Sequence, residues 1–329
     1  MYGIISVYKV GIRYVYRLSE PEIVWNMVTL NQQATLWDAP LARPQRRVHS
    51  FYQTLAYRRL DMVFESAPTI PFDDTTRLIF FSDCHRGDNS RADAFRVNKS
   101  LFLHALHHYY ERGFTYIEVG DGDELWKNRR FATVQAAHAE VFALFQQFAG
   151  QQRLHLLFGN HDILGNRRHP VNKGGLIARE GLILQERHSG QQIFVTHGHQ
   201  ADTKSDIFYQ VSRMAVRNVW RRLQLMHMAP IGCRDGEAHA PRAYEQHLMS
   251  WAADRRRVLI CGHTHRPTSA AYGETPYFNT GYCLAPGVLT GLELQHGEIN
   301  LVRWRATPHN ATPFQREILS QPRRLKYFW

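Results

Sequence analysis

The sequence has few cysteines and no long apolar run, and both absences exclude classes of protein. Its 329 residues include four cysteines without Cys-x-x-Cys spacing, too few to staple a chain of this length with disulfides. No apolar run approaches the ~20 residues needed to span a bilayer. The apolar N-terminal stretch is interrupted by Lys9 and Arg13 and has no small-residue cleavage site. We therefore expect a cytoplasmic protein with neither a membrane-spanning helix nor a signal peptide.

Acidic residues are also scarce relative to basic ones. There are 29 Asp and Glu against 40 Lys and Arg, a formal net charge of +11. The electrostatic field of this positive charge favours anionic partners, which include phosphates, nucleic acid and an acidic membrane surface. The charge does not choose among them. Histidine, by contrast, is abundant, with 19 residues. Because imidazole is the commonest side-chain metal ligand, this excess directs attention to clusters of histidine.

Short apolar runs with abrupt polar ends recur along the chain and predict buried β-strands. Apolar residues at helical spacing predict helices over 94–112 and 131–148, between the first three of these runs. Strands that alternate with helices indicate βαβ units and a layered α/β sheet. The predicted strands cover residues 76–83, 115–121, 154–160, 193–198 and 258–263.

The remaining segments define the expected domain organisation. Residues 1–75 form an N-terminal extension, whose basic amphipathic stretch 43–67 predicts a helix packed on the body. The core domain covers 76–305. Within it, residues 203–256 carry two helix candidates separated by a Pro- and Gly-bearing stretch, which predicts a helical insertion. Further strands, including a hairpin, complete the domain. The tail, 306–329, has no readable pattern.

Residue types that bind metals stand at the end of each predicted strand, in the segments SDCHRGD, GDGDELW, GNHD, HGH and GHTHRP. Because the carboxyl ends of strands in an open α/β sheet line one crevice, we expect these side chains to converge. Aspartate, histidine and asparagine without cysteine suit Mn²⁺, Fe, Zn²⁺ or Co²⁺ better than a soft metal. The set is too large for one tetrahedral ion and fits two ions that share a carboxylate, ~3.5–4 Å apart. The candidates are Asp83, His85, Asp121, Asn160, His197, His263 and His265.

These five segments, in this order and over residues 76–283, resemble the motifs of the calcineurin-like metallophosphoesterase superfamily. The resemblance implies an α/β fold in which a two-sheet β-sandwich is flanked by helices in four layers, with the helical insertion added. It also implies two divalent metal ions, Mn²⁺ first, with Fe, Zn or Co as alternatives. One ion would be held by Asp83, His85 and His265 and the other by Asn160, His197 and His263, with Asp121 bridging them.

The same resemblance implies a hydrolase of phosphoric ester or anhydride bonds. A hydroxide that bridges the two ions would attack phosphorus in line, and the leaving oxygen needs a proton. His161, beside the ligand Asn160, is the expected general acid, with Asp162 orienting or charging it. The non-bridging oxygens call for cationic donors. The substrate-binding candidates are Arg86, Arg167, Arg168, His199 and, on the insertion acting as a lid, Arg217 and Arg221.

Within the superfamily, the segments GDGDELW, HGHQADTKSDIFYQ and GHTHRP are similar to the UDP-2,3-diacylglucosamine hydrolase branch. That branch also carries a helical insertion before the last motif. At the position of His161 that branch typically has Arg, and at the position of His199 it typically has Asp. A histidine at position 161 instead matches the phosphomonoesterase, diesterase and nuclease branches. The expected substrate is therefore a phosphorylated small molecule or a nucleotide-linked lipid, the latter with peripheral contact at the inner face of a membrane.

Two other functions stay open on the sequence. The first is the same chemistry on another substrate. The enzyme would then be a phosphomonoesterase or protein phosphatase, or else a nuclease or cyclic-nucleotide phosphodiesterase. A basic protein that binds nucleic acid or a membrane around a structural metal site would instead depend on the net charge of +11. Such a protein would show steeply salt-dependent binding and no Mn²⁺-stimulated turnover. The presence of all seven ligand positions together with His161 favours an enzyme.

Overall fold

The chain divides into two units, Met1–Val48 and His49–Trp329. In the first, β1 (Ile4–Lys9) and β2 (Ile12–Arg17) pair as an antiparallel hairpin. The second contains two sheets and the helices that cover them. The computed structural model describes residues 4–9, 12–17, 50–163, 171–202, 216, 221–226, 242–271, 273–307 and 313–328.

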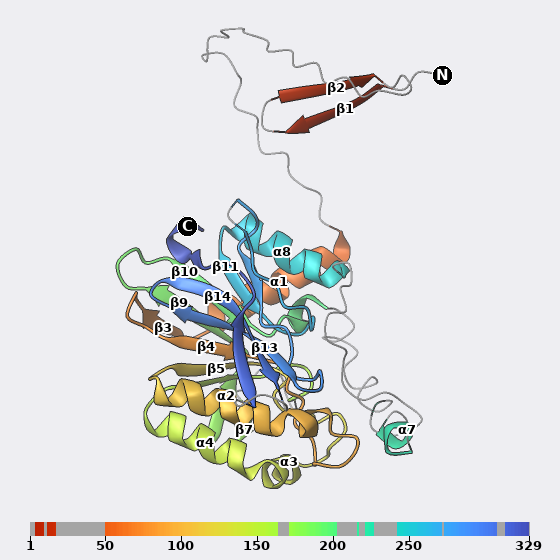
Figure 1. Ribbon diagram of the computed structural model, residues 1–329, viewed down its shortest axis with the longest axis vertical. Coiled ribbons are helices and arrows are strands. Elements are labelled where there is room, and N and C mark those ends of the chain that lie inside the picture. The colour runs from red at the N-terminus through yellow and green to blue at the C-terminus, as the bar shows by residue number, and fades with distance from the viewer. Residues whose placement is uncertain are drawn as a thin grey trace. The chain divides into compact units, whose positions relative to one another are not determined.

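Two β-sheets form the centre of the second unit (Figure 1). The smaller has the order β12-β11-β10-β9-β3, and these strands are Tyr277–Asn279, Val258–Cys261, Gln192–Thr196, Gly181–Glu186 and Thr69–Phe72. The larger has the order β15-β14-β13-β4-β5-β6-β8-β7, and β16 also pairs with β14. Its strands in chain order are β4 (Leu78–Phe81), β5 (Thr115–Val119), β6 (Leu154–Leu157), β7 (Val171–Lys173), β8 (Leu176–Arg179), β13 (Val288–Gln295), β14 (Glu298–Ala306), β15 (Phe314–Ile318) and β16 (Arg323–Arg324).

The central strands are apolar throughout because both of their faces are buried. In β4, Leu78 and Phe80 pack in a core that both sheets share, while Ile79 and Phe81 pack in a second core with the helices. Strands β9, β10 and β11 alternate in the same way between the shared core and a third core on the other side. Since β4, β5 and β6 run parallel, as do β10 and β11, their carboxyl ends lie at one edge of each sheet.

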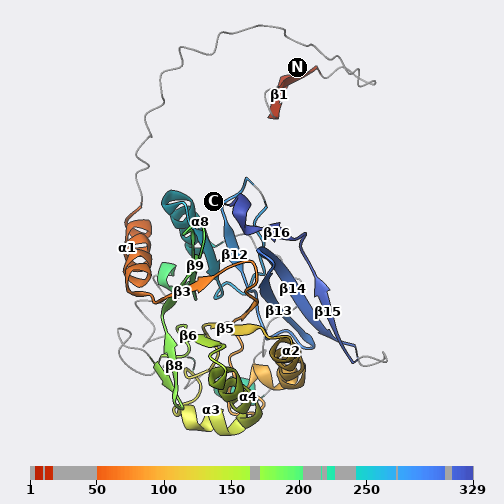
Figure 2. The same ribbon diagram turned by 90° about the vertical axis from the view of Figure 1, so that its left-hand side faces the viewer.

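Helices cover the outer face of each sheet. On the larger sheet these are α2 (Lys99–Glu111) and α4 (Ala139–Gly150). On the smaller sheet they are α1 (Phe51–Ser66) and α8 (Ala243–Arg255), as Figures 1 and 2 show. The order helix, sheet, sheet, helix confirms the predicted four-layer α/β fold. No helix in the part of the chain that the structure describes has the length and apolar character to cross a membrane.

Two predicted helices are divided by a local break. The 94–112 segment begins as a 3-10 turn, η1 (Ala94–Asn98), and the 131–148 segment is split at His138 into α3 (Phe131–Ala137) and α4. His138 is buried, and its Nε2 lies 2.8 Å from Oδ2 of Asp93, a contact that an apolar pattern does not reveal. Of the predicted insertion, the structure describes α7 (Arg221–Leu225) and α8, and most of its first helix candidate lies outside the described residues.

The structure places the first boundary earlier than the sequence pattern does. Helix α1 packs on β9 and α8, as expected, but β3 also joins the smaller sheet, parallel to β9. The main unit therefore begins at His49 rather than near residue 76. In the tail, β15 and β16 extend the larger sheet through β14. The sequence pattern does not reveal these added strands, because they are short and most of their side chains are exposed or only partly buried, so they lack the apolar run of a central strand.

Candidate metal centre

The ligand-type residues stand on loops that leave the carboxyl ends of five strands, β4, β5, β6, β10 and β11. These loops turn abruptly. A left-handed backbone is rare and strained for residues other than glycine, and strain of this kind concentrates at functional sites. Two backbone hydrogen bonds tie the first two loops together, from Asp83 N to Gly120 O at 3.1 Å and from His85 N to Asp121 O at 2.9 Å. The backbone φ lies between 48° and 66° at Asp83, His85, Asp121, His263 and His265.

Glycines directly before two of the ligands allow the loops to approach each other closely. A Cβ at Gly159 would lie 2.1 Å from Oδ1 of Asp121. A Cβ at Gly262 would lie 2.4 Å from the Ser82 hydroxyl, which also binds Asp83. Neither position can accept a larger side chain without moving a predicted ligand or the Ser82 hydroxyl, which explains the Gly-Asn and Gly-His pairs in the sequence motifs.

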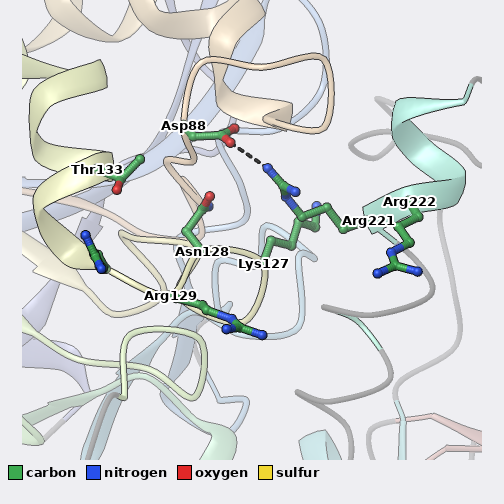
Figure 3. A pocket seen from close by; sticks show the side chains of 8 residues that line it. Asp88, Lys127, Asn128, Arg129, Thr133, Arg221 and Arg222 are labelled. Atoms are coloured by element: carbon green, nitrogen blue, oxygen red, sulfur yellow. Dashed lines mark hydrogen bonds and ion pairs between the residues drawn. The ribbon is translucent and has the colours of Figure 1, made fainter.

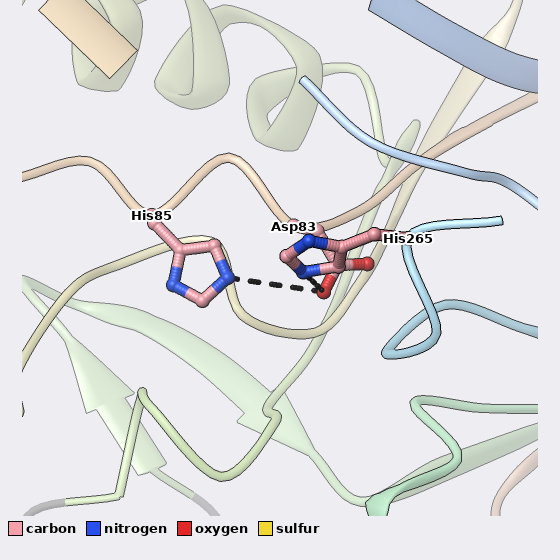
Figure 4. A group of neighbouring side chains, drawn as sticks. All are labelled: Asp83, His85 and His265. Atoms are coloured by element: carbon pink, nitrogen blue, oxygen red, sulfur yellow. Dashed lines mark ion pairs between the residues drawn. The ribbon is translucent and has the colours of Figure 1, made fainter. Parts of the chain in front are cut away.

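The structure brings the predicted ligands together in overlapping groups. In the first, the Nε2 atoms of His265 and His85 lie 3.1 and 3.9 Å from Oδ1 of Asp83 (Figure 4). In the second, Nε2 of His197 lies 3.2 Å from Oδ2 of Asp121, and His263 completes the group. Asp121 Oδ2 is also 3.7 Å from His85 Nε2. Asp121 therefore stands between the two groups, where the sequence predicted a shared carboxylate.

Several of these side chains present a buried polar atom that makes no hydrogen bond among the described residues, although some of these atoms face one another as the ion pairs just given. Buried polar groups are normally satisfied, so such atoms call for an explanation. For Asp83, one oxygen is already engaged, because Oδ2 accepts from Ser82 Oγ and from the backbone N–H of His263 at 3.0 Å. For His197, Nδ1 donates to Val119 O at 2.8 Å and leaves Nε2 facing the ligands. The unpartnered atoms are Asp83 Oδ1, His85 Nε2, Asn160 Oδ1, His197 Nε2 and His263 Nε2. These lone pairs fit a divalent cation.

The electrostatics of the two aspartates agree with that fit. Burial alone would raise the pKa of Asp83, but the charges of His265 and His197 outweigh it and lower the pKa to about 2. Burial is likewise outweighed at Asp121, where His197 and His161 hold the pKa well below its ordinary range. Both side chains are therefore carboxylates at neutral pH. Conversely, Asp121 and Asp83 overcome the desolvation of His197 and raise its pKa to about 9, so a metal ion would take the place of that proton.

His161 lies beside this centre and is held on three sides. Its backbone N–H donates to Asp121 Oδ1 at 2.8 Å. Its ring stacks on Trp126 with centroids 4.0 Å apart, and Nδ1 lies 2.9 Å from Oε1 of Glu124. Burial disfavours its charged form, but Glu124 and Asp121 outweigh burial and raise the pKa of His161. The ring is thus fixed with one nitrogen engaged and the other able to donate a proton.

Asp162 does not orient His161, contrary to the prediction. Its carboxylate accepts backbone N–H bonds from Asp123 at 2.7 Å and Gly159 at 2.8 Å, and Lys173 Nζ lies 2.9 Å away. The partner of His161 is instead Glu124, in the loop that carries Asp121. Asp162 therefore links the loop that carries Asp121 to the loop that carries Asn160.

Arg86 is likewise not placed for the predicted contact with a substrate phosphate. Its guanidinium is fully buried, with Nη1 and Nη2 2.6 and 2.8 Å from the Glu118 carboxylate and Nε 2.9 Å from Asp123. Lys173 Nζ joins the same group, 2.8 Å from Asp123. Two cations thus pair with three carboxylates in a buried charge network next to the metal-site loops, made of Arg86, Glu118, Asp123, Asp162 and Lys173.

The other predicted substrate contacts are only partly described. His199 is fully buried, with its ring centroid 5.5 Å from that of His197, so it packs beside a predicted ligand and does not face open space. Arg221, on α7, binds Asp88 at 2.7 Å. Arg167, Arg168 and Arg217 lie outside the described residues.

A cavity of about 360 Å³ opens over the predicted ligands. His161 lines it together with the exposed faces of both ligand groups. Sequence reasoning missed Trp126, Lys127 and Gln224, which also line it. Trp126 is the last residue of the GDGDELW segment and Lys127 follows it, so their position in the chain was a usable signal, whereas Gln224 reaches the cavity from α7 through tertiary structure alone.

Comparison with known proteins adds a family match. A model described as calcineurin-like phosphoesterase matches residues 76–267, a range that contains every predicted ligand. No curated protein sequence matches this chain.

Similar solved structures include a single mutant of Vps29 from Entamoeba histolytica, 14% identical, with 74% of this chain and 98% of that chain covered and a TM-score of 0.37. Vacuolar Protein Sorting 29 from Cryptosporidium parvum is 13% identical, with 75% of this chain and 98% of that chain covered and a TM-score of 0.37. The cold-active protein-tyrosine phosphatase of a psychrophilic Shewanella species is 13% identical, with 97% of this chain and 99% of that chain covered and a TM-score of 0.38. Nothing about function follows from these likenesses.

Proposed function

Because the chain belongs to the calcineurin-like phosphoesterase family, we propose that it is a hydrolase of phosphoric ester or anhydride bonds that uses two divalent metal ions, Mn²⁺ first among them. The observation that carries this proposal is the set of unpartnered buried ligand atoms that converge from separate strand ends. A merely structural turn would satisfy these atoms within the protein.

The ligand groups support one role for each side chain. Asp83, His85 and His265 would hold one ion, and Asn160, His197 and His263 the other, with Asp121 shared. When bound, such ions supply Lewis-acid activation of water and neutralise charge on the phosphoryl oxygens. The chain itself contributes the orientation of these groups, through the hydrogen bonds that Ser82 and Val119 make with the ligands.

His161 would act as general acid toward the leaving oxygen. Since Nδ1 faces Glu124, Nε2 is the nitrogen that donates the proton. The Glu124 carboxylate stabilises the imidazolium before transfer, and Trp126 stacks on the ring and keeps it at the cavity wall. Proton transfer by a positioned side chain of this kind contributes typically ~10²–10⁴ in rate.

The finer substrate proposal is a nucleotide-linked lipid, cleaved by a cytoplasmic protein with peripheral contact at the inner face of a membrane. It is supported by the motif similarity to the UDP-2,3-diacylglucosamine hydrolase branch. The competing substrates are phosphomonoesters, nucleic acids and cyclic nucleotides, which place the same phosphoryl group over the same ligands.

A Mn²⁺-supplemented hydrolysis screen tests both levels of this proposal. It compares phosphomonoesters, phosphodiesters, UDP-linked lipids and cyclic nucleotides, with and without chelator, and it includes Asp121→Asn. We expect turnover of at least one class by the wild type, loss of that turnover with chelator, and loss of both metal content and turnover in the variant. Salt-sensitive binding of nucleic acid or anionic vesicles without turnover of any class would instead support the non-enzymatic alternative.

A further inference from the structure

A second cavity, about 480 Å³ in volume, is lined mainly by cationic side chains (Figure 3). They come from two segments far apart in the sequence. Lys127, Arg129 and Arg130 belong to the loop that follows the second motif, and Arg221 and Arg222 belong to α7. Asp88 is the one carboxylate among the lining residues that the structure describes, and its charge is taken up by Arg221 at 2.7 Å. We call this the basic cavity.

The positive charges in the basic cavity exceed the negative charges that the described residues place beside them. Arg129, Arg130 and Arg222 are exposed, and no carboxylate within ion-pair distance of any of them occurs among the described residues. Gathering like charges around a hollow costs free energy unless an anion or solvent screens them, and a hollow lined by one sign of charge concentrates ions of the opposite sign. Arg86, which is fully buried, is by contrast paired with Glu118 and Asp123.

The basic cavity adjoins the metal centre through Lys127, which lines both cavities. Lys127 Nζ lies 3.7 Å from the carboxylate of Glu124, the residue that holds His161. The neighbouring residue, Trp126, stacks on His161 and donates to the backbone oxygen of Asn160 at 2.6 Å. One short loop therefore contacts the reacting site at one end and lines the basic cavity at the other.

We propose that the basic cavity binds a second phosphoryl group of the substrate, which is retained while the first is attacked over the metal ligands. The inference rests on the proposed phosphoesterase function and narrows it to substrates with two phosphoryl groups that reach both sides of Lys127. Guanidinium groups suit this task because they bind phosphate oxygens in pairs. A substrate with a single phosphoryl group leaves Arg129, Arg130 and Arg222 without a ligand.

The test compares two chromogenic esters that differ in one group, thymidine 5′-(p-nitrophenyl phosphate) and the same ester with a 3′-phosphate. In both, water adds to the 5′ phosphorus, the bond to the nitrophenyl oxygen breaks, and nitrophenolate and a thymidine 5′-phosphate leave while a proton passes to solvent. Only nitrophenolate is measured, so any cleavage at the 3′ side does not contribute. We expect kcat/KM to be about tenfold or more higher for the 3′-phosphorylated ester, mainly through KM.

Variants assign that preference to the basic cavity. In Arg129→Gln/Arg130→Gln, and independently in Arg222→Gln, the ratio of kcat/KM between the two esters should fall toward one. A control, Arg58→Gln/Arg256→Gln, removes two exposed charges from the helical layer on the smaller sheet and should keep the wild-type ratio. A wild-type ratio near one, or a ratio that the cavity variants leave unchanged, overturns the proposal while the phosphoesterase function stands.

If the wild type hydrolyses neither ester, the Mn²⁺-supplemented screen decides the proposed function, and a binding measurement decides whether the basic cavity takes a second phosphate. Calorimetric titration with thymidine 3′,5′-bisphosphate and thymidine 5′-monophosphate should then show tighter binding of the bisphosphate, lost in Arg129→Gln/Arg130→Gln and kept in the control. Equal affinity for the two nucleotides rejects the second phosphate site.

Discussion

His161 is the residue whose role in the reaction is most open to measurement. Replacing it with glutamine removes the proton donor but leaves each proposed ligand in place. We expect kcat to fall by about 10²–10⁴ for esters with poor leaving groups and much less for nitrophenyl esters, whose leaving oxygen needs little protonation. The metal content measured by elemental analysis should stay near that of the wild type.

His107→Gln, on the exposed face of α2, is the matched control and should have wild-type rates. An equal loss of rate for good and poor leaving groups in His161→Gln would contradict the role as general acid.

Glu124 should set the pH range in which His161 can act. Burial lowers the pKa of His161, but the charge of Glu124, followed by that of Asp121, raises it above its ordinary value. A general acid works in its protonated form, so activity is lost as pH rises through its pKa. Glu124→Gln removes a raising charge, and the basic limb of the kcat profile should therefore move to lower pH.

The measurement for this variant is kcat against pH in buffers of constant ionic strength, with metal content checked in parallel. The exposed Glu140, which pairs with Lys99 on the helices, supplies the control Glu140→Gln. A basic limb that stays in place in Glu124→Gln would show that some other group provides the proton.

At the scale of elements, β7 contributes Lys173, whose side chain binds carboxylates in the metal-site loops. Lys173 is buried and contacts Asp123 at 2.8 Å and Asp162 at 2.9 Å. Its removal would leave three buried carboxylates with Arg86 as their cation. Breaking a buried ion pair in this way costs ~3–5 kcal/mol, so Lys173→Met should lower the free energy of unfolding by about that amount.

Urea denaturation measures this change, with Lys99→Met as control. Lys99 pairs with Glu140 near the surface, where an ion pair contributes only ~0–1 kcal/mol. Equal stability losses in the two variants would mean that the buried charge network is not what supports the loops.

At the scale of the whole molecule, the division after Val48 makes the N-terminal unit separable. Among the residues that the structure describes, the core of the two sheets and every proposed ligand lie in His49–Trp329. A chain that starts at His49 should therefore keep its turnover of a nitrophenyl ester. Its Tm should shift by less than about 2 °C, which corresponds to a change of under ~1 kcal/mol in the free energy of unfolding. A chain cut instead at residue 76 would lose α1 and β3 and should fail to fold, because both pack on the smaller sheet.

Thermal unfolding followed by circular dichroism, together with the ester assay, distinguishes the two truncations. A large loss of stability on removing residues 1–48 would place the boundary of the folding unit elsewhere.

Much of the fold was readable from the sequence because central strands are buried on both faces and therefore appear as apolar runs. Those runs located β4, β5, β6, β10 and β11 and, through the polar residues at their ends, the ligand set. Strands β3 and β15 carried no such signal because most of their side chains are exposed or only partly buried.

What the sequence by itself determined is therefore the identity of the ligand-type residues, since their chemistry and their places at strand ends are local properties. Only the tertiary structure decided which charged side chain serves which partner. Arg86 and Asp162 stand beside the ligands in sequence, yet both point into the buried charge network, because desolvated charges must be paired where they lie. Glu124 took the place beside His161, and the basic cavity arose where α7 meets a loop some ninety residues earlier in the chain. Contacts of that kind depend on how distant segments pack, and no spacing along the chain encodes them.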